Sequence, residues 1–237
     1  MTSDVGSRLW QVQQTIRQHS EAVQRDPKSV ALVAVSKTQP VEKINELHAI
    51  GQSWFGENYL QEALPKIQYF QTKNVDIKWH LIGHLQSNKV KDAVGKFHLI
   101  HSVDSFDLAQ KIEQQVPARC DEKFVQSVLL QVNLGGEKTK SGFEPNEVES
   151  AFLEILNFKH VLVSGLMTMP PLQNTPEQNR VHFQNLRKLM HKLHGTPHPK
   201  AKNMIELSMG TSHDFHIAIE EGATIVRVGT SLFGQRT

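Results

Sequence analysis

The amino-acid sequence predicts an α/β fold: a single (β/α)8 TIM-type barrel domain that spans residues 1–237 and has an extra N-terminal helix. Short apolar runs of β-strand character alternate with longer segments of helical period, and no linker or low-complexity stretch interrupts them. The length of 237 residues is also about that of one eight-fold barrel.

Eight runs are expected to form strands, at residues 31–36, 53–56, 77–82, 97–101, 126–132, 161–166, 204–207 and 224–228. Because helical segments separate these runs, neighbouring strands are expected to be parallel. Eight such units close into a barrel more naturally than they spread into a flat sheet. An open doubly wound sheet remains the alternative.

The helices between the strands are marked by residues typical of helix ends. Pro40 begins a helical segment that Gly51 ends, and TPEQ at 175–178 has the pattern of an N-cap, a first-turn proline and a capping partner. A further helix is expected to start near Asp214 and to end before Gly222.

The two ends of the chain complete the predicted barrel. After the last strand only SLFGQRT remains, which is too short for a long eighth helix, whereas residues 4–24 form a helical segment with no strand before it. We expect this leading helix to cover the part of the barrel wall that a missing last helix would leave bare.

Composition excludes several classes of protein. A formal net charge of +2, from 26 basic and 24 acidic residues, provides no basic stripe for nucleic acid. A lone cysteine, Cys120, excludes an internal disulfide and fits a reducing compartment. The N-terminus lacks a signal-peptide pattern and no window approaches the apolar length of a membrane span, so a cytoplasmic protein without a membrane partner is expected.

In such a barrel, functional residues gather where strands end. The residues that follow the predicted strands are mostly polar or glycine: Lys37, Glu57-Asn58, Gly83-His84, Asp104, Asn133, Met167, Ser208-Met209-Gly210 and Gly229-Thr230.

Lys37 is the first candidate for chemistry. It follows an apolar run and is expected at the barrel mouth, where removing an ammonium from water is costly. The neutral amine is thereby favoured, and it is the form that condenses with an aldehyde. The alternative is a strand-end lysine whose ammonium reaches water.

Two segments near the C-terminal end predict an anion site. ELSMGTSHDF at 206–215 and RVGTSLFG at 227–234 each supply a strand end, a glycine and hydroxyl side chains. The loops after strands seven and eight of many barrels hold phosphate, helped by backbone amides at a helix start. The alternative is two ordinary glycine turns with capping serines.

Arg227 lies two residues before Gly229, so strand alternation would place both on the same face. An unpaired guanidinium inside a barrel is costly, and we therefore expect an acceptor close to it. The alternative is an outward arginine paired with Glu220 or Glu221.

Other features weigh less. His80 and His84 are four residues apart, but a predicted strand end falls between them, so no metal site is expected. In the loop NLGGEKTKSGF, Lys138 or Lys140 could reach over the mouth, although a solvated loop is the default.

Seven blocks in the same order along nearly the whole chain resemble the pyridoxal phosphate homeostasis proteins, also called the YggS or PROSC family. The blocks are AVSKTQP around Lys37, FGENYLQE at 55–62, WHLIGHLQSNK at 79–89, KSGF at 140–143, GLMTM at 165–169, LSMGTSHDF at 207–215 and ATIVRVGTSLFG at 223–234.

The resemblance implies a fold similar to the barrel domain of alanine racemase, with pyridoxal 5'-phosphate (PLP) held as a Schiff base on Lys37. It also implies that Arg227 lies beside the ring nitrogen and that Asn58 is a polar neighbour of the cofactor. Phosphate contacts are implied at Ser208, Met209, Gly210, Ser212, Gly229 and Thr230. Where the family has SMGMSDD this chain has SMGTSHD, so Thr211 and His213 depart from the pattern.

The implied function is intracellular vitamin B6 cofactor homeostasis, by storage or delivery of PLP, with little or no catalysis. PLP-requiring apo-enzymes are the implied recipients, and a monomer or weak dimer is expected. The alternative is a PLP-dependent amino-acid racemase, which needs a second base such as the tyrosine that related racemases bring from another domain. A pure interaction module would need neither Lys37 nor the phosphate segments.

Overall fold

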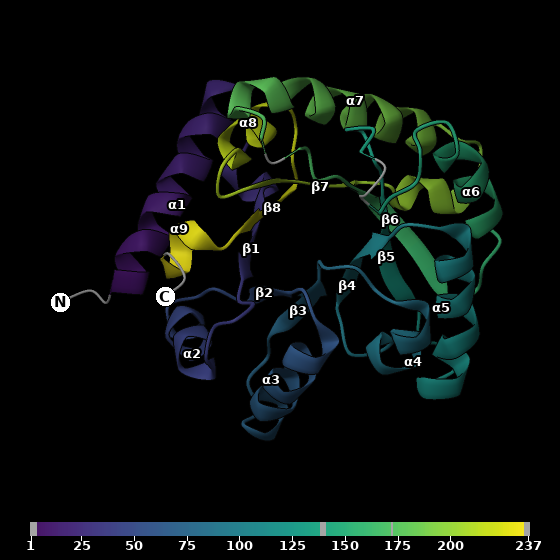
Figure 1. Ribbon diagram of the computed structural model, residues 1–237, viewed down its shortest axis with the longest axis horizontal. Coiled ribbons are helices and arrows are strands. Elements are labelled where there is room, and N and C mark those ends of the chain that lie inside the picture. The colour runs from purple at the N-terminus through teal and green to yellow at the C-terminus, as the bar shows by residue number, and fades with distance from the viewer. Residues whose placement is uncertain (1–3, 138–140, 172, 235–237) are drawn as a thin grey trace.

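The computed structural model describes residues 4–137, 141–171 and 173–234. Its eight strands form a closed barrel in sequence order, and every strand is parallel to the next, with β8 returning to β1 (Figure 1). The strands are β1 Ala31–Val35, β2 Trp54–Glu57, β3 Lys78–Leu81, β4 Leu99–Val103, β5 Gln126–Gln131, β6 Val161–Met167, β7 Glu206–Thr211 and β8 Ile225–Val228. The predicted barrel is confirmed, and the open sheet is excluded because no edge between β1 and β8 is left unpaired.

Helices surround the strands. They are α1 Asp4–Ala22, α2 Val41–Ala49, α3 Leu60–Thr72, α4 Val90–Ala93, α5 Phe106–Arg119, α6 Val148–Ile155, α7 Pro176–His194, α8 Phe215–Glu220 and α9 Thr230–Phe233. The predicted capping box is present at the start of α7, where the Thr175 and Gln178 side chains each accept a hydrogen bond from the other residue's backbone amide. Gly51 and Gly222 follow α2 and α8 with positive φ, as expected for helix ends.

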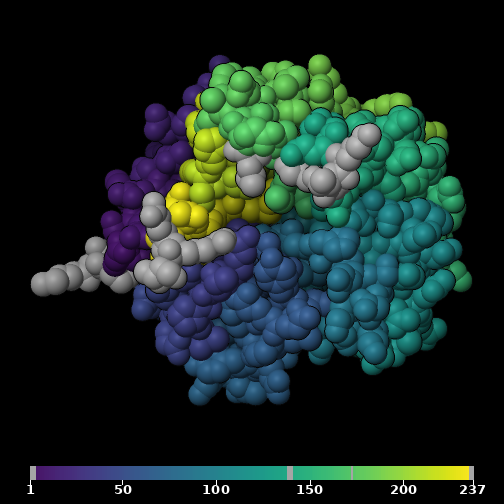
Figure 2. Space-filling view, in the orientation of Figure 1, coloured from purple at the N-terminus to yellow at the C-terminus, as the bar shows by residue number. Residues whose placement is uncertain are grey.

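Helix α1 covers the barrel wall next to the chain's end, which confirms the prediction for the leading helix. It packs against α8, α9 and α2, with Leu9, Val12 and Ile16 buried on its inner face. In Figure 2 this helix, in purple, lies directly beside the yellow C-terminal segment. After α1, the guanidinium of Arg25 donates to the carbonyls of Ile219 and Ala223, which fastens this end of the chain to α8.

The strands separate two apolar regions. The larger one fills the space between barrel and helices, and the smaller one, inside the barrel, contains Val33, Leu99, Leu129, Met167 and Ile225. Alternation of side chains along each strand produces this division. Ala34 and Val226, for example, belong to the outer region although each adjoins an inner residue.

Two predicted strands are displaced. Strand four was expected at 97–101 and lies at Leu99–Val103, because Phe97 is buried by packing against helices rather than by pairing in the sheet. Strand seven was expected to end at 207, yet it continues to Thr211. Gly210 makes this possible: its φ of +89° falls where the register with β8 shifts, and an added Cβ would lie 2.6 Å from the Cβ of Ala218.

Candidate functional site

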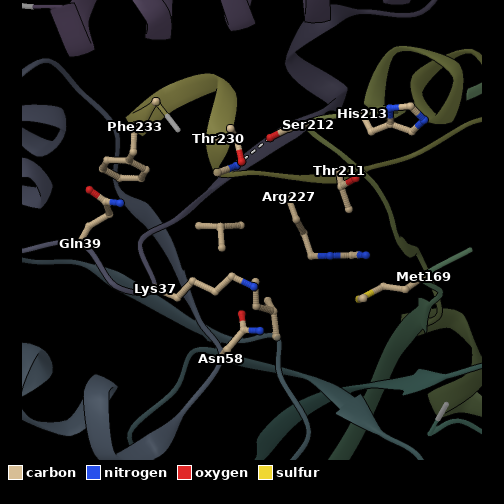
Figure 3. Close-up of a pocket in the computed structure, with 14 residues that line it drawn as sticks. Lys37, Gln39, Asn58, Met169, Thr211, Ser212, His213, Arg227, Thr230 and Phe233 are labelled. Atoms are coloured by element: carbon tan, nitrogen blue, oxygen red, sulfur yellow. Dashed lines mark hydrogen bonds between the residues drawn. The ribbon is translucent and has the colours of Figure 1, made fainter. Parts of the chain in front are cut away.

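A cavity of about 450 Å³ opens at the carboxyl ends of the strands. This volume is within the range of small-molecule sites. The lining residues are Val35, Lys37, Gln39, Asn58, Ile82, Met169, Thr211, Ser212, His213, Arg227, Gly229, Thr230, Phe233 and Gly234. Figure 3 shows Lys37, Asn58 and Arg227 around the centre, with Ser212 and Thr230 on another side.

A tight turn at the end of β1 presents Lys37. The amide of Gln39 donates to the carbonyl of Ser36 over 3.0 Å, and Thr38 has a positive φ of 63°. The Thr38 amide donates to the carboxylate of Glu62 on α3. Hydrogen bonds of the residues before and after Lys37 thus hold its backbone in place. The Lys37 side chain is half-buried.

A buried ion cluster supports this turn from behind. The Lys66 ammonium donates to the Ser36 carbonyl (2.9 Å), to Glu57 (2.9 Å) and to Glu62 (2.6 Å). The Ser36 hydroxyl also donates to Glu57, over 2.6 Å. Burial raises the pKa of Glu57, against the opposing effects of Ser36 and Lys66. The cluster thus ties the ends of β1 and β2 to α3.

Asn58 follows β2 beside Lys37. Its side-chain oxygen is buried and has no hydrogen-bond partner among the residues described. The chain after β3 presses closely on its backbone: a Cβ added to Gly83 would lie 2.2 Å from the Asn58 carbonyl oxygen. Glycine at 83 therefore allows the two backbones to pack closely. The Asn58 side-chain oxygen is a separate feature, a buried acceptor with no donor among the described residues.

Arg227 points inward from β8 and is 3% exposed. It donates to the Ser208 hydroxyl (2.6 Å) and to the Thr168 carbonyl (3.0 Å), so the expected nearby acceptors are present. Burial lowers the pKa of Arg227 to about 10, opposed by Asp214, and the side chain remains charged at neutral pH. The alternative of an outward arginine is wrong, because Arg227 is buried with its partners inside the barrel, and Glu220 and Glu221 pair with Arg180.

The loops after β7 and β8 meet at Ser212. Its hydroxyl accepts from the amides of Gly229 (3.1 Å) and Ser231 (3.4 Å). Asp214 holds the loop from behind by accepting from the Thr211 amide over 2.7 Å, and it is itself held by Asn179 on α7. Hydroxyls and backbone amides from two loops thus converge at one side of the cavity.

Six of the nine residues expected at the site line the cavity: Lys37, Asn58, Ser212, Arg227, Gly229 and Thr230. The other three, Ser208, Met209 and Gly210, do not line it and lie within β7. Ser208 points into the barrel against Arg227, and Met209 is fully buried in the outer apolar region. The two departures from the family pattern, Thr211 and His213, do line the cavity. Lys138 and Lys140 lie outside the described residues.

Several residues at the site were not anticipated. Gln39, Ile82, Met169, Phe233 and Gly234 line the cavity, and Met169 is 42% exposed. Gln39 could have been found as the second residue after Lys37 on the same turn. The apolar wall formed by Ile82 and Phe233 had no local signal, since isolated apolar residues are ordinary in any strand or helix.

The described residues offer neither a metal site nor a membrane-spanning helix. Across the described ranges, no group of three or more His, Cys, Asp or Glu side chains is arranged to hold a metal ion. Nor does any helix in these ranges have the length and apolarity needed to cross a membrane.

Comparison with known proteins first defines the class. The family model described as "Alanine racemase, N-terminal domain" matches residues 10–237. A solved protein of unknown function from Bifidobacterium adolescentis superposes with a TM-score of 0.88 at 33% identity, over 97% of this chain and 94% of that one. The chain is therefore a barrel of the alanine racemase N-terminal type.

The particular family follows from nearer relatives. The pyridoxal phosphate homeostasis protein of Aquifex aeolicus is 44% identical over 234 residues, 97% of each chain. The structure of PipY from Synechococcus elongatus with PLP bound superposes with a TM-score of 0.80 at 38% identity, over 93% of this chain and 99% of that one. This chain belongs to the pyridoxal phosphate homeostasis protein family.

Proposed function

We propose that this protein binds PLP as a Schiff base on Lys37 and serves to store or deliver the cofactor. One observation carries the proposal: Lys37, Arg227 and the hydroxyls of Ser212 and Thr230 line a single cavity of about 450 Å³. These groups match the three reactive or charged parts of PLP, which are an aldehyde, a pyridine nitrogen and a phosphate. The structure of the relative PipY with PLP bound supports PLP as the ligand.

The residues fit the cofactor part by part. Condensation of the Lys37 amine with the aldehyde forms the Schiff base and releases one water molecule. The Ser212 hydroxyl accepts from the Gly229 amide, so its own proton can be donated to the phosphate, and Gly229 and Thr230 line the same side of the cavity. The buried side-chain oxygen of Asn58, which has no partner among the described residues, can accept a hydrogen bond from the ligand. Ser208, Met209 and Gly210 act indirectly in this proposal, by placing Arg227 and the loop after β7.

Arg227 gives the reason for a carrier rather than a catalyst. When bound, PLP can withdraw electrons from an attached amine most strongly with its ring nitrogen protonated. A guanidinium that is still charged at neutral pH donates hydrogen bonds and keeps that nitrogen unprotonated. The cofactor is thus held without being strongly activated, which suits delivery to PLP-requiring apo-enzymes.

Absorbance spectroscopy of the purified protein incubated with PLP tests the proposal. We expect a visible band that disappears on borohydride reduction, with the phosphopyridoxyl mass on the peptide that contains Lys37. Lys37→Arg keeps the positive charge but cannot form the Schiff base, and it should give neither band nor adduct. Lys78→Ala, which removes a partly exposed lysine outside the cavity, should behave as the wild type. A colourless wild type, or an adduct on another lysine, contradicts the proposal.

A further inference from the structure

A row of four polar side chains crosses the inside of the barrel. The Arg227 guanidinium lies 2.6 Å from the Ser208 hydroxyl, which lies 2.8 Å from Nδ1 of His101. Nε2 of His101 lies 2.8 Å from Nδ1 of His80. The four side chains come from β8, β7, β4 and β3, and none is more than 3% exposed. Because β3 and β4 lie opposite β7 and β8 in the closed barrel, the row runs from one wall to the other.

Arginine can only donate, and this favours one direction for the hydrogen bonds in the row. The Ser208 oxygen accepts from Arg227, so its own proton is free to go to Nδ1 of His101. His101 then carries its proton on Nε2 and donates to Nδ1 of His80, which in turn carries its proton on Nε2.

The opposite direction, in which His80 donates to His101 and His101 donates to Ser208, leaves one more buried polar group without a hydrogen bond. If Nδ1 of His101 donated to Ser208, the serine proton would have no acceptor among the contacts described, since Arg227 and His101 are its two partners. Nε2 of His80 is buried without a partner in either arrangement. The first arrangement therefore leaves one unsatisfied group, at the end farthest from Arg227, and the second leaves two.

Neither histidine adds a second positive charge to the barrel interior. Burial lowers the pKa of His80 to about 3, and burial together with the neighbouring His80 and Arg227 lowers the pKa of His101 well below its usual range. The row consists of one charged donor and three neutral groups. Such a row holds the guanidinium in place but does not pass a proton to it.

We propose that His80, His101 and Ser208 are positioning residues that form a one-way hydrogen-bond relay and hold the Arg227 guanidinium at the ring-nitrogen end of the cofactor cavity. This inference rests on the proposed function for the identity of the ligand. The relay itself exists in the protein without ligand. Its two consequences are a fixed histidine tautomer and a slowly exchanging guanidinium.

The first test uses the unsubstituted, cofactor-free protein. Long-range nitrogen–proton NMR correlation of the histidine side chains should show His101 and His80 as neutral Nε2–H tautomers from pH 5.5 to pH 8.5, values chosen to bracket the ordinary histidine pKa. A His101 that is protonated, or that carries its proton on Nδ1, overturns the relay. This measurement requires no substitution at the relay, so it holds even if a variant fails to fold.

The second test measures hydrogen exchange of the Arg227 side chain, again without cofactor. Ser208→Ala and His101→Phe should speed this exchange by roughly tenfold or more, as expected for the loss of one hydrogen bond to a charged group. Ser208→Thr, which keeps the hydroxyl, should restore the wild-type rate. His98→Phe is the matched control, because His98 contacts the ring of His80 but makes no bond in the relay. Equal rates in all five proteins overturn the positioning role.

Addition of PLP then links the relay to the ligand. The Schiff-base band of Ser208→Ala and His101→Phe should shift in wavelength or weaken relative to the wild type, whereas Ser208→Thr and His98→Phe should match it. If the wild type binds PLP and all variants give identical spectra, the relay does not position Arg227 for the ligand. If the wild type takes up no PLP, the proposed function fails, and the cofactor-free measurements still decide whether the relay exists.

Discussion

At the scale of single residues, the two serines of the β7 region have different tasks although they are four residues apart. The Ser212 hydroxyl faces the cavity and binds loop amides, whereas the Ser208 hydroxyl faces Arg227 inside the barrel. The family resemblance implied a phosphate contact for both, and strand seven was expected to end before Ser208. The longer strand turns Ser208 inward and separates the two roles.

This difference predicts which substitutions discriminate between phosphorylated and unphosphorylated ligands. Ser212→Ala with Thr230→Ala should weaken PLP roughly tenfold or more relative to pyridoxal, because only PLP loses charge-assisted hydrogen bonds. Ser208→Ala should weaken both ligands by similar factors. Competition titrations followed at the Schiff-base band measure the ratio. Equal losses for both ligands in the double variant would place the phosphate elsewhere.

The buried histidines predict a dependence of stability on pH. An unfolded histidine takes up a proton near pH 6.5, whereas folded His80 stays neutral down to about pH 3. Stability that is present above pH 6.5 is therefore lost as the pH falls from 6.5 towards 3, at about 1.4 kcal/mol per pH unit for one such group. Urea unfolding at pH 7.5 and 5.5 should show this loss, and His80→Gln should reduce it by about 1 kcal/mol.

The control for this experiment is His191→Gln, the same substitution at an exposed histidine of α7 that lies outside the row from Arg227 to His80. The comparison uses the difference between the two pH values within each protein, so any general destabilisation by the substitution cancels. An unchanged dependence in His80→Gln would mean that His80 takes up its proton at the same pH in the folded and the unfolded state, which contradicts the lowered pKa.

At the scale of elements, the sequence predicted what local pattern determines and missed what distant segments decide together. The capping box at 175–178 and the glycine helix ends were found because a few consecutive residues fix them. The continuation of β7 past Ser208 depends on a register shift against β8, and no local signal carries it. His80 and His101 were missed as a pair for the same reason, because they meet inside the barrel from two strands.

Helix α1 offers a test of element packing in two adjacent residues. Leu9 is 3% exposed and faces the barrel wall, whereas Trp10 is 62% exposed. Leu9→Ala should lower the free energy of unfolding by about 2–4 kcal/mol, through lost burial and the cavity that remains. Trp10→Ala should change it by less than about 0.5 kcal/mol. Denaturant unfolding measures both, and similar values would show that α1 does not stabilise the barrel.

At the scale of the whole molecule, the described residues place Lys37 in the cavity but no second base opposite it. Racemisation requires bases on both faces of the α-carbon, and such help is worth roughly a hundred- to ten-thousand-fold. Tyr59 and Tyr69 are 61% and 41% exposed and do not line the cavity. His213 lines it, but its Nε2 bonds to the Asn174 carbonyl, and Figure 3 shows its ring pointing away from Lys37.

We therefore expect no efficient racemase or transaminase activity. The PLP-loaded protein should be incubated with single enantiomers of common amino acids in deuterated water, and both α-proton exchange and chirality should be followed. Turnover far below the median enzyme rate of about ten per second is expected. A rate near that value would show that a second base reaches the substrate, and would favour the racemase alternative.

The filled interior of the barrel also limits the routes by which a ligand can reach the cavity at Lys37. Below the cavity, the ring of strands is occupied by the row from Arg227 to His80 and by the inner apolar residues, all at most 5% exposed. Among the described residues, the barrel interior below the cavity is therefore filled with side chains. We therefore expect a ligand to enter and leave through the carboxyl end of the barrel, where Met169 lies exposed beside the cavity. A direct hand-over would require the receiving protein to dock on that same face.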